Sequence, residues 1–301
     1  MDFELTEEMK MLKEMAYKFA VAEVGPISQE CDEHEKYLPE IRIKAAQNGL
    51  VGAWIPDEYG GSGAGILGNT IITEEISKVD MGIGLNIVAS GFGCESILNY
   101  GTEEQKKTYL PPVCDGTKVC AGAYTEPNAG TDVSGYKTRA VKDGKDYVIN
   151  GNKMFITNGT VCDFMVAQCI TNPEEKKHNS FSLIIIPADA KGVARNKLHG
   201  KMGIRASDTA EIALEDVRVP QSNLVGKEGQ GFRQLMHFFD ITRVMVSGQA
   251  LGLSEACLET SIKYVKERTA FGASLGSFQM TQMKLTEMAI RIEALRGLVY
   301  K

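Results

Sequence analysis

The sequence lacks the features that mark several large classes of protein. Its 301 residues contain no long apolar run, and FSLIIIP (181–187) is far too short to cross a bilayer, so membrane insertion is not expected. Runs of lysine or arginine are also missing and the formal net charge is −6, which argues against a nucleic-acid partner. The acidic start, MDFELTEE, has neither a signal peptide's apolar core nor a transit peptide's arginines, so we expect a cytoplasmic protein.

Cysteine and histidine are too few and too scattered to suggest a disulfide framework or a metal centre. The seven cysteines include no C-x-x-C, and the four histidines are isolated from one another. We therefore expect free, buried thiols and no metal site.

A glycine-rich loop raises the question of a nucleotide-binding fingerprint. Residues 63–68, GAGILG, match G-x-G-x-x-G, which holds a pyrophosphate when it follows a buried strand and opens a helix. Here the polar residues 56–58, PDE, stand where an apolar strand would run. The amphipathic segment after the loop is not followed promptly by a second strand. We interpret the loop as the entry to a helix and reject a Rossmann fold.

The pattern along the chain predicts an α+β fold in three parts. Residues 1–119 read as an N-terminal helical domain, in which Thr6 can cap the first helix. Residues 120–228 read as a central antiparallel β-domain, in which Asp143-Gly144 and Asn150-Gly151 favour hairpin turns. Residues 229–301 form a C-terminal helical domain. Its helical pattern continues to Lys301 without a cap, so we expect this domain to be incomplete here.

Four segments carry the chemistry: AYTEPNAGTD (123–132), NGNKMFITNG (150–159), FDITRVMVSGQALG (239–252) and KERTAFGASLGSFQ (266–279). Together with GIRASDTAE and GQGF, and in this helical–β–helical order, they resemble the acyl-CoA dehydrogenase family over essentially the whole chain. The resemblance implies an FAD-dependent enzyme that removes hydrogen from the α,β-carbons of an acyl-CoA thioester. It also implies an electron-transfer flavoprotein as the electron acceptor.

The resemblance assigns five residues of the central domain to the cofactor. It places Tyr124 and Thr125 along one side of the flavin ring and Phe155 and Thr157 along another, with Thr131 near both flavin and thioester. Taken alone, each threonine reads equally as a hydroxyl bonded to backbone. Phe155 replaces the family's commoner tryptophan, and it could stack on the flavin or be a core aromatic.

Three residues near the C-terminus match positions that reach the FAD of a neighbouring subunit, namely Arg268, Phe271 and Gln279. Arginine suits a pyrophosphate because its planar fork makes charge-assisted, bidentate bonds. Without the motif, Arg268 would read as a solvated charge at a helix end. With it, the resemblance implies an obligate homo-oligomer, a tetramer.

Asp240 and Arg243 lie three residues apart on one helical face. The resemblance assigns them, with Thr131, to the substrate, with the F-D-x-x-R positions binding the CoA part, while an intrahelical ion pair is the alternative. Thr242, where a minority of the family carries the catalytic carboxylate, cannot act as a base at neutral pH. The base is therefore unknown and expected beyond Lys301. Glu255 and Glu293 are expected on solvated helix faces.

The sequence does not identify the acyl group of the substrate. Residues 81–98 are rich in glycine and other small residues, which would suit a branched, cyclic or aromatic acyl group or, equally, close helix packing. Two other functions also stay open. One is an acyl-CoA oxidase of the same fold, and the other is a non-catalytic relative that binds acyl-CoA or flavin.

Overall fold

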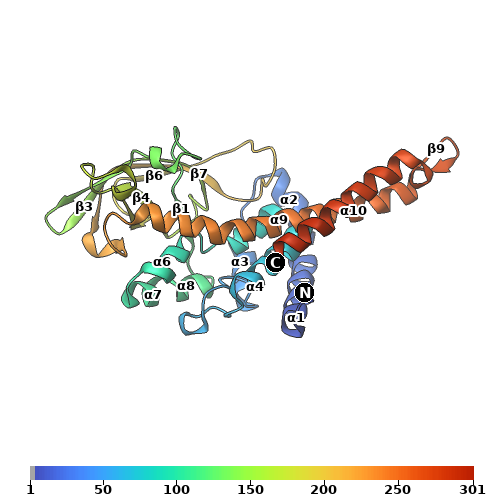
Figure 1. Cartoon of the computed structure of the whole chain (residues 1–301), viewed down its shortest axis with the longest axis horizontal. Coiled ribbons are helices and arrows are strands. Elements are labelled where there is room, and N and C mark those ends of the chain that lie inside the picture. Colours follow the sequence, from blue (N-terminus) through green and yellow to red (C-terminus); the bar gives the residue numbers. More distant parts are fainter. Residues whose placement is uncertain (1–3) are drawn as a thin grey trace.

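A computed structural model describes residues 4–301 and shows helices before and after a β-sheet (Figure 1). The helices that precede the sheet are α1 (Glu7–Phe19), α2 (Ser28–Glu33), α3 (Pro39–Gln47), α4 (Gly65–Val79), α5 (Met81–Val88), α6 (Cys94–Tyr100), α7 (Glu103–Tyr109) and α8 (Pro111–Cys114). After the sheet come α9 (Gly231–Glu267), the hairpin strands β9 (Thr269–Ala270) and β10 (Ala273–Ser274), and α10 (Gln279–Val299). The mixed α+β fold predicted from the sequence is confirmed.

Local sequence signals explain where the first helices begin. Thr6 accepts a hydrogen bond from the Met9 amide at 3.3 Å and so caps α1, as predicted. Thr102 and Gln105 form a reciprocal capping box at α7. The glycine loop enters α4 at Gly65, and the preceding residues form a 3₁₀ turn, Asp57–Tyr59, rather than a strand. The rejection of a Rossmann fold is therefore confirmed.

The sheet has eight strands in the order β6-β7-β3-β2-β4-β5-β8, with β1 paired to β4. Their bounds are β1 (Cys120–Ala123), β2 (Arg139–Asp143), β3 (Asp146–Thr157), β4 (Phe164–Ile170), β5 (Phe181–Pro187), β6 (Val193–Lys197), β7 (Thr209–Pro220) and β8 (Leu224–Val225). Most neighbouring strands pair antiparallel, as expected, but β4 runs parallel to both β1 and β2, which was not predicted. Long connections let strands return in the same direction, and the sequence pattern carries no sign of that.

The two predicted hairpin turns have different outcomes. Asp143-Gly144 lies at a hairpin in which Asp143 pairs with Asp146, and Gly144 has the positive φ that such a turn needs. Asn150-Gly151 is not a turn, because both residues lie inside β3. There the Asn150 side chain bonds to Asp216 of the neighbouring strand at 2.9 and 3.0 Å. Gly151 instead allows close approach, since a Cβ would lie 2.7 Å from the Thr138 Cα.

Short non-α segments complete the main chain. A π-helical turn, Ala20–Val24, and a 3₁₀ turn, Gly25–Ile27, continue from α1. The other 3₁₀ turns are Val133–Gly135, Lys177–Asn179, Gln221–Asn223 and Leu275–Ser277. All seven cysteines are free, and only Cys257 is exposed, which confirms the expected buried thiols for the other six. Within residues 4–301, no helix is both long enough and apolar enough to span a bilayer.

The core that positions the site joins the three parts of the chain. One apolar cluster combines Ile97 and Leu110 from the N-terminal helices with Val166 and Leu183 from the sheet and Phe238 from α9. Burial of such side chains contributes roughly 1.5–3 kcal/mol each, so α9 is held against the sheet by its own apolar residues. The positions of the boundaries at 119/120 and 228/229 stay predictions.

A buried ionic network ties α1, α4, α9 and α10 together. The fully buried Glu74 carboxylate receives Lys13 Nζ at 2.8 Å and the Tyr300 hydroxyl at 2.5 Å. Oxygens of Glu74, Glu75 and Glu255 lie within 4.8 Å of one another. Arg296 binds Glu255 at 2.5 Å, so cations separate these like charges.

Replacing Lys13 by methionine will lower the free energy of unfolding by about 2 kcal/mol, because it leaves Glu74 buried with a missing partner. This value is below that for a fully buried pair because the Lys13 side chain is 29% exposed. Urea denaturation measures the effect. Lys18→Met on the same helix is the control, because both side chains of its pair with Glu14 are exposed and solvent screens their attraction, so its loss should have little effect on stability. Equal effects of the two substitutions would contradict the importance of the network.

Candidate functional site

The two threonine-bearing segments of the central part lie beside one pocket. The Met154 amide, on β3, donates to the Thr125 carbonyl at 2.9 Å, which joins the segment after β1 to β3. A pocket of about 550 Å³ opens there. Its lining comes from β1, β3, α9 and the loop before α6, and consists of Phe92, Gly122, Tyr124, Thr125, Phe155, Ile156, Thr157, Phe238, Phe239, Thr242, Arg243, Val246 and Ser247. Four of the five residues predicted to hold the flavin are therefore brought together.

Phe155 reaches the pocket through an irregularity in β3. The pairing of β3 with β7 shifts register between Lys153 and Ile156, and Phe155 takes a φ of 59°. A bulge redirects a side chain, and a non-glycine residue at positive φ costs on the order of 1–3 kcal/mol. The ring is 67% exposed, so Phe155 is not the core aromatic that the sequence left as an alternative.

Thr157 ends β3 immediately before a pinned turn. Asn158 also has positive φ, and its amide donates to the Asp208 carbonyl at 3.0 Å. Its side-chain nitrogen donates to the Ala89 carbonyl at 2.9 Å, which ties the turn to the end of α5. Thr157, which lines the pocket, therefore lies next to a turn that is held on two sides.

Helix α9 forms the opposite wall of the pocket with aromatic side chains. The Phe238 ring packs edge-on against Phe92 and Tyr124, with ring centroids 5.9 and 5.1 Å away. Such edge-to-face pairs add about 0.5–1.5 kcal/mol beyond area burial. Tyr124 and Phe238 are buried whereas Phe155 and Arg243 are exposed, so the aromatic cluster closes the inner end and the charged residue stands at the mouth.

Asp240 and Arg243 form the ion pair that the sequence left as an alternative to ligand binding. Arg243 Nη1 lies 3.5 Å from Asp240 Oδ1, and both side chains are more than two-thirds exposed. Arg243 also lines the pocket, so a ligand could still bind its guanidinium. Thr131 is exposed and lies outside the pocket lining, so the structure does not bring it to the other flavin residues.

The other predicted cofactor residues lie on or near the β9–β10 hairpin, at the far end of α9 and α10 from the sheet (Figure 1). Arg268, Phe271 and Gln279 are all exposed, and the Phe271 side chain is 98% exposed at a φ of 52°. Within one chain, therefore, the structure does not bring these three residues to the pocket.

None of the residues that line the pocket within 4–301 carries a carboxylate. Thr242 is buried, and its hydroxyl donates to the Phe238 carbonyl at 3.0 Å. Glu293 is exposed as expected, but Glu255 is not, because it is buried and paired with Lys78 and Arg296. The expectation of a solvated face for Glu255 is wrong because α10 packs over it.

The small residues of segment 81–98 serve helix packing. A Cβ on Gly82 would lie 3.2 Å from the Ala206 Cβ, and one on Gly93 would lie 3.1 Å from the Val166 Cβ. Of this segment only Phe92 lines the pocket. These glycines therefore give no support to a branched, cyclic or aromatic acyl group. Val244 lies outside the pocket lining, which its neighbours Thr242, Arg243 and Val246 supply.

The chemistry of the lining fits the expected flavin. An isoalloxazine is flat and carries hydrogen-bonding groups along one edge. Thr125 and Thr157 offer hydroxyls to such an edge, and the exposed Phe155 ring offers a stacking face. Gly122 lines the pocket without a side chain. A Cβ at this position would lie 2.8 Å from the Tyr124 ring.

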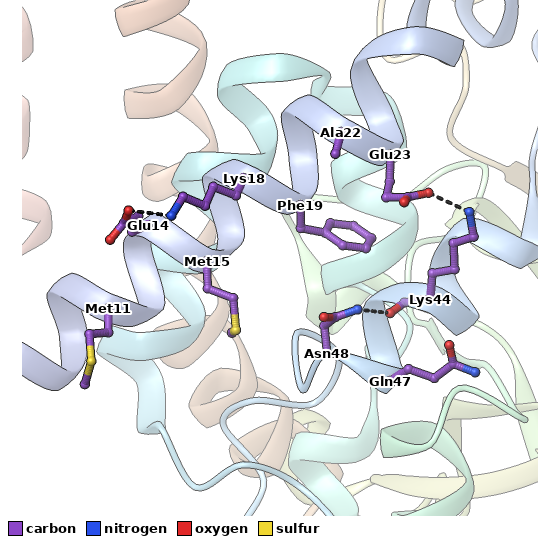
Figure 2. Close-up of a pocket in the computed structure, with 10 residues that line it drawn as sticks. All are labelled: Met11, Glu14, Met15, Lys18, Phe19, Ala22, Glu23, Lys44, Gln47 and Asn48. Carbon is purple, nitrogen blue, oxygen red and sulfur yellow. Dashed lines mark hydrogen bonds and ion pairs between the residues drawn. The ribbon is translucent and has the colours of Figure 1, made fainter.

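A separate hollow of about 590 Å³ lies between α1 and α3 (Figure 2). Its charged side chains bind one another, with Lys18 2.6 Å from Glu14 and Lys44 2.5 Å from Glu23. The aromatic Phe19 points into the space between the two helices. This hollow offers neither the paired hydroxyls nor the stacking rings of the Thr125–Thr157 pocket, so we assign the cofactor to the latter.

The sequence analysis missed several residues of the pocket. Phe92, Phe238 and Phe239 were not singled out, although the adjacent aromatics of HFFD, 237–240, were a visible signal. Lys153 and Glu126, which lie within the motifs, were also passed over because they read as ordinary charged residues. Their positions follow from the fold alone.

Comparison with known proteins agrees with this geometry. Family models described as the N-terminal, middle and C-terminal domains of acyl-CoA dehydrogenase match residues 6–117, 121–217 and 229–301. A short-chain-specific acyl-CoA dehydrogenase of Clostridium acetobutylicum is 43% identical over 302 residues, which cover 100% of this chain and 79% of the relative.

Two solved structures superpose over the whole chain. One, described as the electron transferring flavoprotein of Acidaminococcus fermentans, has a TM-score of 0.96 and 42% identity and covers 100% of this chain and 79% of the other. The second, butyryl-CoA dehydrogenase from Megasphaera elsdenii, has a TM-score of 0.95 and 38% identity with the same coverage.

Proposed function

The chain belongs to the acyl-CoA dehydrogenase family, and we propose that it oxidises a short-chain acyl-CoA and passes the electrons to an electron-transfer flavoprotein. It is an FAD-dependent oxidoreductase. The observation that carries the proposal is that Thr125 and Thr157 line one pocket together with the aromatic residues Phe155, Phe238 and Phe239. The acceptor is supported by the superposition on the flavoprotein structure from Acidaminococcus fermentans.

The residues of the chain would bind and orient the reactants. FAD, when bound, accepts the hydride from the β-carbon of the thioester. Thr125 and Thr157 would hold the ring edge through their hydroxyls, and the Phe155 ring would stack on the flavin. Arg243, at the mouth, can exchange its exposed ion pair with Asp240 for the phosphates of CoA.

The base that removes the α-proton is not assigned to any residue from 4 to 301. The pocket lining supports this, because it offers no carboxylate and because Thr242 donates its proton to a backbone carbonyl. A suitable base needs a pKa raised by burial beside the apolar substrate. We therefore propose that the base is none of the residues that line this pocket.

The acyl group is proposed to be short. Phe92, Tyr124 and Phe238 pack together at the buried end of the pocket, so a long chain would have to displace an aromatic cluster. The short-chain-specific and butyryl-CoA enzymes among the compared proteins support the same size.

A second subunit is proposed to complete the cofactor site, in a homo-oligomer that we propose to be a tetramer. Arg268, Phe271 and Gln279 are exposed at the remote end of α9 and α10, where they are free to reach another molecule. Thr131, exposed and outside the pocket lining, is proposed to contact ligand only after the cofactor and substrate bind.

The absorption spectrum of the purified protein tests the function. Reconstitution with FAD should give flavin bands that bleach with butyryl-CoA faster than with octanoyl-CoA. The bleached form should transfer electrons to an electron-transfer flavoprotein faster than to oxygen. An absence of flavin bands would overturn the cofactor site, while bleaching by octanoyl-CoA alone would overturn only the short acyl group.

Replacing Thr157 by valine will raise the FAD dissociation constant about five- to tenfold, because it removes one hydrogen bond worth about 1 kcal/mol. Fluorescence titration of the apoprotein with FAD measures the constant. Thr108→Val, on the exposed face of α7, is the control and should leave it unchanged. Equal affinity of the Thr157 variant and the parent protein would contradict the role of this hydroxyl.

A further inference from the structure

Lys153 is a fully buried cation beneath the pocket. Its side chain has 0% exposure, and its ammonium donates to the Tyr124 carbonyl at 3.1 Å, to the Gln168 carbonyl at 2.8 Å and to Glu126 Oε1 at 3.0 Å. The nitrogen also lies 5.0 Å from the centre of the Tyr136 ring. All three ammonium protons are therefore used, as a buried charge requires.

The Glu126 carboxylate also accepts hydrogen bonds from Lys137 and Thr138. Its Oε1 accepts the Thr138 amide at 3.0 Å and the Thr138 hydroxyl at 2.6 Å, and its Oε2 accepts the Lys137 amide at 2.6 Å. Burial alone would raise the pKa of Glu126, but the Lys153 charge and these hydrogen bonds outweigh burial and lower it. The lowered pKa favours the ionised carboxylate of Glu126, whereas burial lowers the pKa of the Lys153 ammonium in spite of the neighbouring Glu126 charge.

The Lys153–Glu126 pair is bonded to the main chain and side chain on either side of Thr125, one of the proposed flavin residues. Tyr124 and Glu126, which flank Thr125, are both bound by the Lys153 ammonium, and the Thr125 carbonyl accepts the amide of the next residue, Met154. Three consecutive residues of the loop after β1 are thus attached to two consecutive residues of β3. Phe155 and Thr157 follow along the same strand and line the same pocket.

We propose that Lys153 and Glu126 are positioning residues that hold Thr125 and Thr157 at the spacing needed to grip the two sides of the flavin ring. This inference rests on the proposed function, since it takes the pocket to be the flavin site. Neither residue lines the pocket, so both act through the main chain to which they are bonded. Without the pair, the loop would keep the Met154–Thr125 hydrogen bond to β3 but would lose both bonds from the Lys153 ammonium, and β1 itself pairs with β4 rather than with β3.

The test compares Lys153→Met, Glu126→Gln and the double variant. Three quantities are measured for each variant: the FAD dissociation constant, the visible spectrum of the bound flavin and the Tm of the apoprotein. Each single variant leaves one buried charge unpaired and so lowers Tm, whereas the double variant removes both charges and recovers much of the Tm. The FAD dissociation constant, however, should stay raised about tenfold in all three, because none restores the link between loop and strand.

Two further variants keep the test decisive. Arg42→Met removes another buried cation, one that binds the Gly116 and Lys118 carbonyls in the N-terminal part, and should lower Tm without changing the FAD constant or spectrum. Thr138→Val removes only the hydroxyl bond to Glu126 and should raise the FAD constant about twofold in a fully folded protein.

The outcomes separate the inference from the function on which it rests. If the FAD constant follows Tm and returns to the parent value in the double variant, the pair is structural only and the inference is overturned. If every variant binds FAD like the parent protein, the inference is also overturned while the flavin site stands. If the parent protein binds no FAD, both are overturned.

Discussion

Replacing Gly252 by alanine will lower the free energy of unfolding by about 3 kcal/mol, because a Cβ there would overlap the Glu74 carbonyl oxygen on α4. One turn earlier, a Cβ on Gly248 would lie 2.8 Å from the Thr70 carbonyl oxygen. The two glycines thus let the backbones of α9 and α4 touch. Adding a methyl group would force the helices apart, and the obstacle is main chain, which cannot rotate away.

The effect of Gly252→Ala should extend to the site, because α9 carries Phe238, Thr242 and Arg243 on the pocket wall. Urea denaturation measures the stability, and titration with an acyl-CoA measures the pocket. Gly297→Ala on α10 is the matched control. Apart from the backbone of α10 itself, no atom of the described residues lies within 4 Å of a Cβ added at Gly297. The substitution should therefore raise the free energy of unfolding by up to about 1 kcal/mol through helix propensity. A Gly252 variant as stable as the parent protein would show that the helices separate without cost.

Replacing Glu95 by glutamine will make the protein more stable than the parent above neutral pH, by about 3 kcal/mol at pH 8. Burial raises the pKa of Glu95 from 4.5 to about 7, against weaker hydrogen bonds from its own amide and that of Gly93. The folded protein therefore binds this proton more tightly than the unfolded chain does. Its contribution to stability is complete below pH 4.5 and is lost as the pH rises to 7.

The measurement is the difference in unfolding free energy between Glu95→Gln and the parent protein across pH 4 to 8. The difference should be near zero at the acid end, because glutamine resembles the neutral acid, and it should grow up to pH 7 and then level off. Glu104→Gln, on the exposed face of α7, is the control and should run parallel to the parent protein. A constant difference for Glu95→Gln would show that this carboxyl does not titrate in that range.

Local signals in the sequence predicted local structure well. Thr6 and Thr102 mark helix starts because a cap depends only on residues within one turn. Asp143-Gly144 marks a hairpin for the same reason. The same kind of signal failed at Asn150-Gly151, because the pairing of nine β3 residues with β7 outweighs one turn preference.

The candidate site was predicted unevenly, for a related reason. The motifs identified Tyr124, Thr125, Phe155 and Thr157, and the structure brings all four to one pocket. The burial of Glu255 could not be foreseen, because it depends on the packing of α10 over α9. The small residues near Gly93 could not be divided between pocket and packing until their neighbours were known.

Composition, capping residues and turn signals were enough to predict an α+β chain and its helical start, since each depends on residue identity or short-range geometry. The flavin chemistry was implied by the resemblance of the motifs to the acyl-CoA dehydrogenase family. The folded molecule alone shows that Lys153 joins the two threonine segments, that Phe238 closes the pocket and that Glu95 is buried. These features arise from contacts between residues far apart in the chain. Such contacts depend on how whole elements pack, and no short stretch of sequence encodes them.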